Sequence, residues 1–276
     1  MTVLNSTQIG FSPTRIFVTR NNTVYVASSA DSQVLEFTEG SVNATRKMSG
    51  GYSLFVTDND DVYTYDGANS RVILWSVNTT SSVPVMFSSA MCGGLFIDVN
   101  NTLYCSITNM HQVVSKSLND PSSTVSIAAG TGCVYSIPSI LNGPLGIFVH
   151  LNFSLYVADS NNHRIQRFTP GQPNATTVAG NGTPGSITLL NPSGIVLDGD
   201  SYLFIVDTGH HRIVKSGSDG FRCVIGCSNA PGSSPSQLSS PQSMSFDTYG
   251  NIWVVDFGNS RVQKFILSVS SSGKYK

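Results

Sequence analysis

Short apolar runs separated by polar turns are the main pattern along this chain. In one stretch, β-branched and aromatic residues cluster in four short runs, at 146–149, 155–158, 164–168 and 175–178. Asn, Gly, Pro and Ser fill the gaps between these runs. Runs of this length and composition, bounded by turn residues, predict short antiparallel strands.

One short motif recurs six times along the chain. An aromatic residue begins it, an acid follows three residues later, and a basic and an aliphatic residue follow eight and nine residues later. The copies begin at Tyr25, Tyr63, Tyr104, Tyr156, Phe204 and Trp253. A repeat of roughly 40 to 50 residues that carries several strands is typical of a propeller blade. A β-sandwich also uses short strands, but it need not repeat one motif in register. We therefore predict an all-β fold, a six-bladed β-propeller of four-stranded antiparallel blades.

The last repeat lacks a recognisable outer strand. It ends with the run 261–265, whereas residues 2–4 precede the first inner strand as an outer strand would. We predict that this N-terminal strand completes the sixth blade, closes the ring and removes an exposed edge. Residues 1–268 are then a single propeller, and residues 269–276 are a polar tail.

The acid and the Arg of the motif occur together or not at all. Four copies carry both residues, whereas the other two have Ser28 with Gln33 and Ile107 with Gln112. Joint presence and joint loss predict that the two side chains form an ion pair within the blade, because a partly buried carboxylate needs a cationic partner. The predicted structural pairs are Asp66 with Arg71, Asp159 with Arg164, Asp207 with Arg212, and Asp256 with Arg261.

Charge and hydropathy exclude several classes of function. The formal net charge is −1 and only 11% of residues are charged. No basic stripe is visible, which argues against an RNA partner. No apolar run approaches the roughly 20 residues that a membrane helix requires. The first residues lack the pattern of a signal peptide. This leaves open whether a leader was removed or the chain is part of a larger protein.

Two stretches of the fourth repeat carry a family resemblance. Residues 156–166 read YVADSNNHRIQ, and residues 177–185 read TVAGNGTPG before the run NPSGI at 191–195. Here the chain resembles the NHL-repeat family, strongly in repeats four to six and weakly in repeats one to three. The resemblance implies a six-bladed propeller that serves as a platform for a protein or peptide partner. Some relatives are the recognition end of tripartite-motif ubiquitin ligases, but the RING, B-box and coiled coil of those proteins are absent from this chain.

The connections between blades are the candidate binding elements. Those near 128–145, 179–193 and 226–242 are long and rich in Gly, Pro, Ser and Asn, whereas residues 49–53 form a minimal one. Long loops on a rigid scaffold often carry recognition, although they can also merely fill space. These connections and the turns between the second and third strands of each blade share one face. Its candidate binding residues are His163, Asn181, His210, His211 and Asn229.

An enzyme with a metal on the propeller axis is the alternative function. The peptidyl-α-hydroxyglycine lyase of the peptide-amidating enzyme is a related propeller that holds zinc through several His residues. Here His111, His163 and His211 share one phase of successive repeats and should diverge around the ring. We assign no catalytic residue, metal ligand or cofactor, but an axial calcium or zinc ion is not excluded. His150 is alone in its phase beside Asp98, Asp198 and Asp247, for which capping of strand ends is the expected role.

The cysteines and the sequons bear on the compartment. An antiparallel hairpin would bring Cys92 to Cys105, and a turn at Gly226 would let Cys223 reach Cys227, leaving Cys133 unpaired. An odd number is equally typical of a reduced cytosolic chain. Eight N-x-[ST] sequons occur, at Asn5, Asn21, Asn43, Asn78, Asn100, Asn152, Asn174 and Asn181. All except Asn5 and Asn181 fall on the face opposite the candidate binding face. Together these features favour an extracellular glycoprotein with disulfides, although Asn also simply favours turns.

Overall fold

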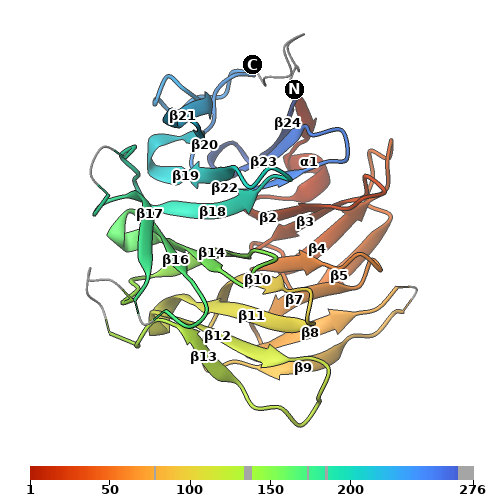
Figure 1. Ribbon diagram of the computed structural model, residues 1–276. Helices are drawn as coiled ribbons and strands as arrows, with labels where there is room; N and C mark the ends of the chain where they lie inside the picture. The colour runs from red at the N-terminus through yellow and green to blue at the C-terminus, as the bar shows by residue number, and fades with distance from the viewer. Residues whose placement is uncertain (78, 134–138, 173, 184–185, 267–276) are drawn as a thin grey trace.

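The protein is a closed ring of six four-stranded antiparallel sheets, as predicted (Figure 1). A computed structural model describes residues 1–77, 79–133, 139–172, 174–183 and 186–266. In every blade the first strand is innermost and the fourth is outermost, and consecutive strands pair with each other. Among the described residues, no helix is long and apolar enough to cross a membrane.

The first three blades occupy the N-terminal half of the chain. Blade 1 contains β2 (Pro13–Val18), β3 (Val24–Ser28), β4 (Gln33–Phe37) and β5 (Arg46–Ser49). Blade 2 contains β6 (Leu54–Val56), β7 (Val62–Asp66), β8 (Arg71–Trp75) and β9 (Val83–Phe87). Blade 3 contains β10 (Cys92–Ile97), β11 (Thr102–Ile107), β12 (Gln112–Ser117) and β13 (Ser126–Ala129).

The other three blades follow the same plan. Blade 4 contains β14 (Pro144–Val149), β15 (Leu155–Asp159), β16 (Arg164–Phe168) and β17 (Thr176–Gly180). Blade 5 contains β18 (Pro192–Leu197), β19 (Leu203–Asp207), β20 (Arg212–Gly217) and β21 (Gly220–Ile225). Blade 6 contains β22 (Pro241–Phe246), β23 (Ile252–Asp256), β24 (Arg261–Phe265) and, as its outer strand, β1 (Thr2–Leu4).

Strand β1 closes the ring, which confirms the prediction from the unequal chain ends. It runs antiparallel to β24, with Thr2 opposite Gln263 and Leu4 opposite Val262 (Figure 1). The side chain of Leu4 is buried in the core between blades 6 and 1. The pairing therefore gives the edge of blade 6 both backbone partners and an apolar anchor.

The hydrophobic cores lie between neighbouring blades. In one of them, Ala158 and Ile165 of blade 4 pack with Ile195 and Ile205 of blade 5. Each buried isoleucine contributes about 1.5–3 kcal/mol by leaving water. Because each core draws on two blades, a blade depends on both of its neighbours.

The described part of the chain contains five short helices outside the sheets. Helix α1 (Ser6–Ile9) precedes blade 1 and begins with a capping box made by Asn5 and Gln8. The other four are single 3-10 turns between the second and third strands of blades 3 to 6, at Thr108–Met110, Ser160–Asn162, Thr208–His210 and Phe257–Asn259. We call the end of the ring that carries these turns and the connections between blades the loop face. The opposite end, with the turns between strands one and two and between strands three and four, is the turn face.

Candidate binding face

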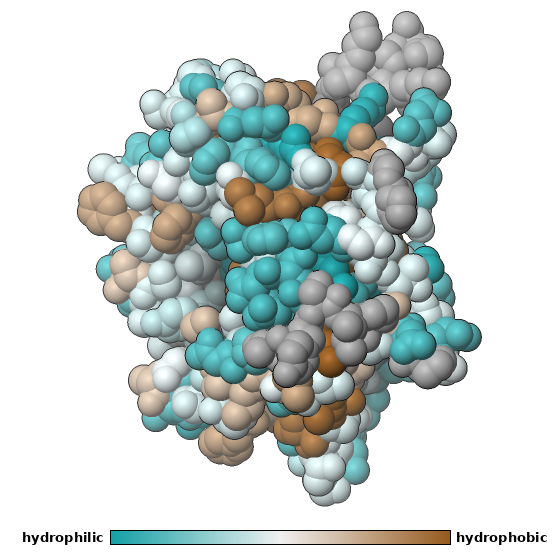
Figure 2. Space-filling view, turned by 90° about the vertical axis from the view of Figure 1, so that its left-hand side faces the viewer, coloured by the Kyte–Doolittle hydropathy of each residue, from teal (hydrophilic) through white to brown (hydrophobic). Residues whose placement is uncertain are grey.

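Connections of very different length emerge on the loop face. Those at 130–143, 181–191 and 226–240 precede blades 4, 5 and 6, whereas those at 50–53 and 88–91 precede blades 2 and 3. Figure 2 views the molecule from the side of these connections, and polar residues gather around the middle of this face. The three long connections thus lie next to one another on one half of the ring.

The structure brings together all four pairs of Asp and Arg. The distance from Arg Nε to Asp Oδ2 is 2.7 Å in blade 4, 2.8 Å in blade 5 and 2.6 Å in blade 6. Their three carboxylates, Asp159, Asp207 and Asp256, are fully buried. The Asp66–Arg71 pair of blade 2 is longer, at 3.2 Å, and its side chains are 15% and 31% exposed. Burial alone would raise the pKa of Asp66, but hydrogen bonds from Asn69 and Arg71 outweigh it and lower the pKa.

In blades 4 to 6 the ion pair also holds the incoming connection. Asp207 Oδ1 accepts a hydrogen bond from the backbone amide of Leu190 at 2.8 Å, and Arg212 Nη2 donates to the carbonyl of Thr188 at 2.8 Å. The same contacts join Asp159 to Asn142 and Arg164 to Ile140 in blade 4, and Asp256 to Ser239 and Arg261 to Gln237 in blade 6. The pair is therefore an anchor for a loop as well as a link within the blade.

A histidine of the preceding blade holds the last residue of each long connection. His163 Nδ1 accepts a hydrogen bond from the amide of Asn191 at 3.1 Å. His111 and His211 accept equivalent bonds from the amides of Gly143 and Ser240, each at 3.0 Å. All three histidines have positive φ, which places the ring beside the neighbouring blade. Each of the three histidines therefore contacts a different connection.

Each long connection also has an apolar anchor and a constrained start. Leu141, Leu189 and Leu238 are buried two residues before the end of the connection. At the other end, Gly180 has a φ of 86°, and a Cβ there would lie 2.3 Å from the carbonyl oxygen of His163. Gly130 and Gly226 meet His111 and His211 in the same way. Only glycine fits this close approach at positive φ without strain.

We call this set of contacts the loop clamp: the His of the preceding blade, the Asp and Arg of the following blade, and the buried Leu. Sequence reasoning found the Asp and Arg but missed their bonds to the connections. A signal was present, because each connection ends in Leu-x-x-Pro, at 141–144, 189–192 and 238–241. A donor three residues after each acid was also visible: Asn69, Asn162, His210 and Asn259 all contact the carboxylate.

The five candidate binding residues have different surroundings. His163 and His211 belong to loop clamps, and His210 Nδ1 lies 2.9 Å from Asp207 Oδ2. Asn229 is exposed, but its Oδ1 accepts a hydrogen bond from Arg212 Nη1 at 3.1 Å. Asn181 is exposed, and its backbone amide donates to the carbonyl of His163. The histidines therefore support the loops, and Asn181 and Asn229 lie at their surface.

The acidic residues near the axis cap turns on the turn face. Asp98, Asp198 and Asp247 each accept two backbone amides of the turn that follows the inner strand. His150 contacts Ser201 of the next blade at 3.2 Å. Within the described ranges, no group of three or more His, Cys, Asp or Glu side chains could hold a metal ion.

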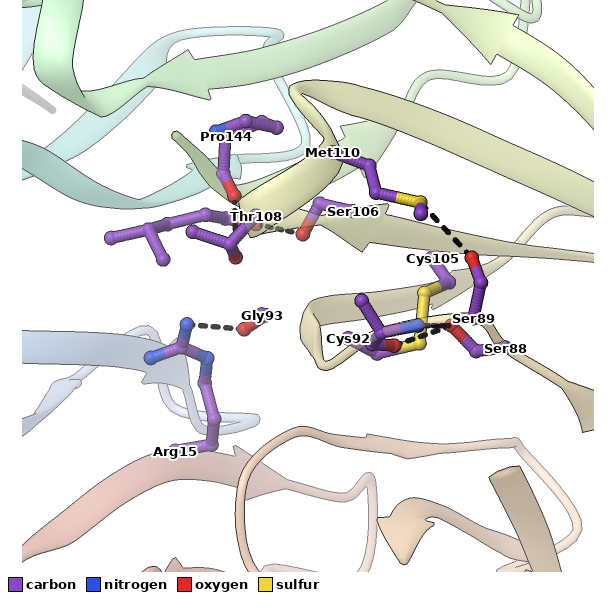
Figure 3. The surroundings of a disulfide bond; sticks show 12 residues. Arg15, Ser88, Ser89, Cys92, Gly93, Cys105, Ser106, Thr108, Met110 and Pro144 are labelled. Carbon is purple, nitrogen blue, oxygen red and sulfur yellow. Dashed lines mark hydrogen bonds between the residues drawn. A yellow bond between two sulfur atoms is a disulfide. The ribbon is translucent and has the colours of Figure 1, made fainter. Parts of the chain in front are cut away.

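Two disulfides lie in blades 3 and 5. Cys92 and Cys105 join the first two strands of blade 3, with a Cα–Cα distance of 5.4 Å, and both are buried (Figure 3). Cys223 and Cys227 are bridged across the turn at Gly226, whose φ is 72°. Cys133 is free and exposed.

Sequence comparison identifies part of the repeat array. A family model described as NHL repeat matches residues 141–168 and 238–265, in blades 4 and 6. NHL repeat-containing protein 3 of Homo sapiens is 31% identical over 96 residues, which are 30% of this chain and 26% of that protein. Its Mus musculus counterpart is 30% identical over 94 residues, which are again 30% of this chain and 26% of that protein. The matched segment is thus about a quarter of the length of these relatives.

Solved structures share the fold along nearly the whole chain. A protein of unknown function from Bacteroides thetaiotaomicron has a TM-score of 0.74 at 17% identity, covering 96% of this chain and 74% of that one. Virginiamycin B lyase from Staphylococcus aureus has a TM-score of 0.65 at 14% identity, covering 100% of this chain and 86% of that one. A chain of a nidogen/laminin complex has a TM-score of 0.63 at 15% identity, covering 94% of this chain and 90% of that one. Identity this low shows the fold alone. Taken together, the six blades and the matched repeats show a six-bladed β-propeller that carries NHL repeats in blades 4 and 6.

Proposed function

We propose that this propeller binds a protein or peptide partner through the loop face. The observation that carries the proposal is the run of three long connections before neighbouring blades, each fixed at its end by a loop clamp. Between their fixed ends, residues such as Asn181 and the segment 227–231 are exposed. Loops presented on a rigid scaffold in this way are the usual carriers of recognition.

The same face also offers apolar contact area. Leu190 lies within a long connection and keeps 37% of its surface exposed, and Phe11, before blade 1, keeps 69%. Apolar side chains among exposed polar loops suit a protein partner better than a nucleic acid. The chain, with its net charge of −1, offers little attraction to phosphate groups.

An extracellular setting is part of this proposal. Two disulfides are typical of proteins that fold in an oxidising compartment. The seven sequon asparagines that the structure describes are all exposed, and only Asn5 and Asn181 lie on the loop face. Glycans on the other five would cover the turn face and leave most of the loop face accessible.

Affinity capture from extracellular fluid of the native source, followed by mass spectrometry, tests the proposal. The loop-face variant combines Asn181→Ala with Leu190→Ser, and the matched turn-face control is Leu151→Ser, whose side chain is 73% exposed. We expect the control to capture the same partner as the wild type and the loop-face variant to lose it. Loss of the partner with the control alone would place binding on the turn face and contradict the proposal.

A further inference from the structure

The ring encloses a cavity along its axis. The inner strands of all six blades line a volume of about 370 Å³, from Arg15 to Val18 in blade 1 and from Ser243 to Phe246 in blade 6. Small-molecule sites commonly have volumes of roughly 300–1,000 Å³. The cavity is inside the ring, so it is separate from the exposed loops of the proposed partner site.

One cation faces this otherwise uncharged space. Arg15 is the only charged residue among the described residues that line the cavity. Its Nη1 donates to the carbonyl oxygens of Thr14 at 2.9 Å and Gln242 at 3.5 Å, and its Nη2 donates to that of Gly93. Figure 3 shows Arg15 of blade 1 pointing toward Gly93 of blade 3, next to the buried disulfide. The guanidinium thus crosses from one blade to another at the end of the cavity near the loop face.

Among the residues that the structure describes, no carboxylate pairs with the positive charge of Arg15. None of the ion pairs in the described part of the chain includes this side chain, and its three acceptors are neutral carbonyl oxygens. Burial lowers the pKa of Arg15 to about 10, so the group still carries its charge at neutral pH. A partly buried cation without a counterion is unfavourable, and an anion would relieve that cost.

Aromatic side chains form the apolar wall of the cavity. Phe17, Phe55, Phe96 and Phe148, from four consecutive blades, pack edge to face or tilted, with centroid distances of 5.4, 5.0 and 4.9 Å. Blades 5 and 6 carry the smaller Val196 and Ser245 at the matching positions, so the arc is incomplete. The cavity therefore combines a planar cation near one end with an arc of phenyl rings around the axis, two residues further along the inner strands.

We propose that the axial cavity binds a small organic carboxylate, with the carboxylate on Arg15 and an apolar or aromatic body against the arc of phenylalanines. The planar guanidinium matches the geometry of a carboxylate, and a charge-assisted hydrogen bond of this kind is stronger than a neutral one. The phenyl rings offer stacking and edge contacts to the rest of the ligand. The proposal does not depend on a partner at the loop face.

Calorimetric titration with 4-phenylbutyrate, and with the isosteric neutral probe 4-phenylbutanamide, tests this site. We expect the carboxylate to bind at least tenfold more tightly than the amide to the wild type. Arg15→Met should remove that preference. The matched control is Arg20→Met, which removes an exposed arginine paired with Asp58 and should leave both affinities unchanged.

Phe148→Val gives a second variant that does not disturb Arg15, since blade 5 already carries valine at the matching position. It should weaken both probes by a similar factor and keep the preference for the carboxylate. This variant and the comparison of probes on the wild type decide the question even if Arg15→Met does not fold. Equal affinity for the two probes, no binding of the carboxylate, or an unchanged preference in a folded Arg15→Met variant would overturn the proposal.

Discussion

Blades 1 to 3 and blades 4 to 6 share the same four-stranded plan, but the connections that lead into them are held by different contacts. Before blades 2 and 3 the connections are short, and a backbone hydrogen bond closes each of them at its start, from Gly50 to Ser32 and from Ser88 to Ser70, each at 3.0 Å. Before blades 4 to 6 the long connections end in loop clamps. The buried pairs of Asp and Arg thus lie where a long loop returns to the ring at a fixed place.

Removing a clamp carboxylate should have the largest effect. We expect Asp207→Ala to lower the free energy of unfolding by about 3–5 kcal/mol, because Arg212 would remain buried without its partner. Asp66→Ala in blade 2 should lower it by less than about 1 kcal/mol, because that pair is partly exposed. Denaturant unfolding of both variants measures the two losses. Similar losses would erase the distinction between the two halves.

The disulfide of blade 3 sharpens the comparison, because it ties the start of β10 to β11 in a blade that lacks the ion pair. Replacing Cys92 and Cys105 together by Ala should lower the free energy of unfolding by about 3 kcal/mol. The same change at Cys223 and Cys227 should lower it by about 2 kcal/mol, since the bridge closes a shorter loop. Denaturant unfolding under non-reducing conditions measures both losses of unfolding free energy. A larger loss for the Cys223 and Cys227 variant would contradict the expectation that the disulfide of blade 3 stabilises the protein more.

Acid should weaken blade 6 at the turn face. Burial alone would raise the pKa of Asp247, but hydrogen bonds from Lys264, Asn251 and Trp253 outweigh it and lower the pKa to about 2. Unfolded Asp titrates near about 3.9, so the stabilisation is complete above about pH 4 and is lost as the pH falls through about 2. It amounts to about 2 kcal/mol.

The change in unfolding free energy between pH 5 and pH 2.5 measures this contribution. Asp247→Asn should lose less stability than the wild type over that interval. Thr57→Ala, at the matching position of blade 2, should keep the pH dependence of the wild type. If Asp247→Asn has the slope of the wild type, other carboxylates govern the acid response.

Within the loop clamps, the smallest effect is expected at a histidine. His163→Ala removes the acceptor of the Asn191 amide, which should cost about 1 kcal/mol locally and speed hydrogen exchange of that amide. Ser70→Ala is the matched control, because Ser70 occupies the same positive-φ position in blade 2. Unchanged exchange at Asn191 in His163→Ala would mean that the Asp and Arg hold the connection alone.

The sequence predicted the strands and the ring closure, and it missed the side-chain contacts that join neighbouring blades. The strands, the six blades and the closing strand at 2–4 follow from apolar periodicity and from the missing outer strand of the last repeat. The loop clamp was missed because it joins residues of two blades across connections of unequal length. Arg15 gave no signal because the matching positions of the other blades hold Ser53, Gly94, Gly146, Gly194 and Ser243. The role of Arg15 becomes visible only in the structure, where the ring places its side chain at the axial cavity.

The pairing of β1 with β24 has a consequence for synthesis. Among the strands of the array, β1 leaves the ribosome first, and its partner β24 leaves last. During translation the edge that β1 will occupy does not yet exist, so Leu4 lacks its strand partner Val262 and the blade 6 part of its core until β24 has emerged. We expect the growing chain to present unpaired strands throughout that interval, which makes it a substrate for chaperones until the ring closes.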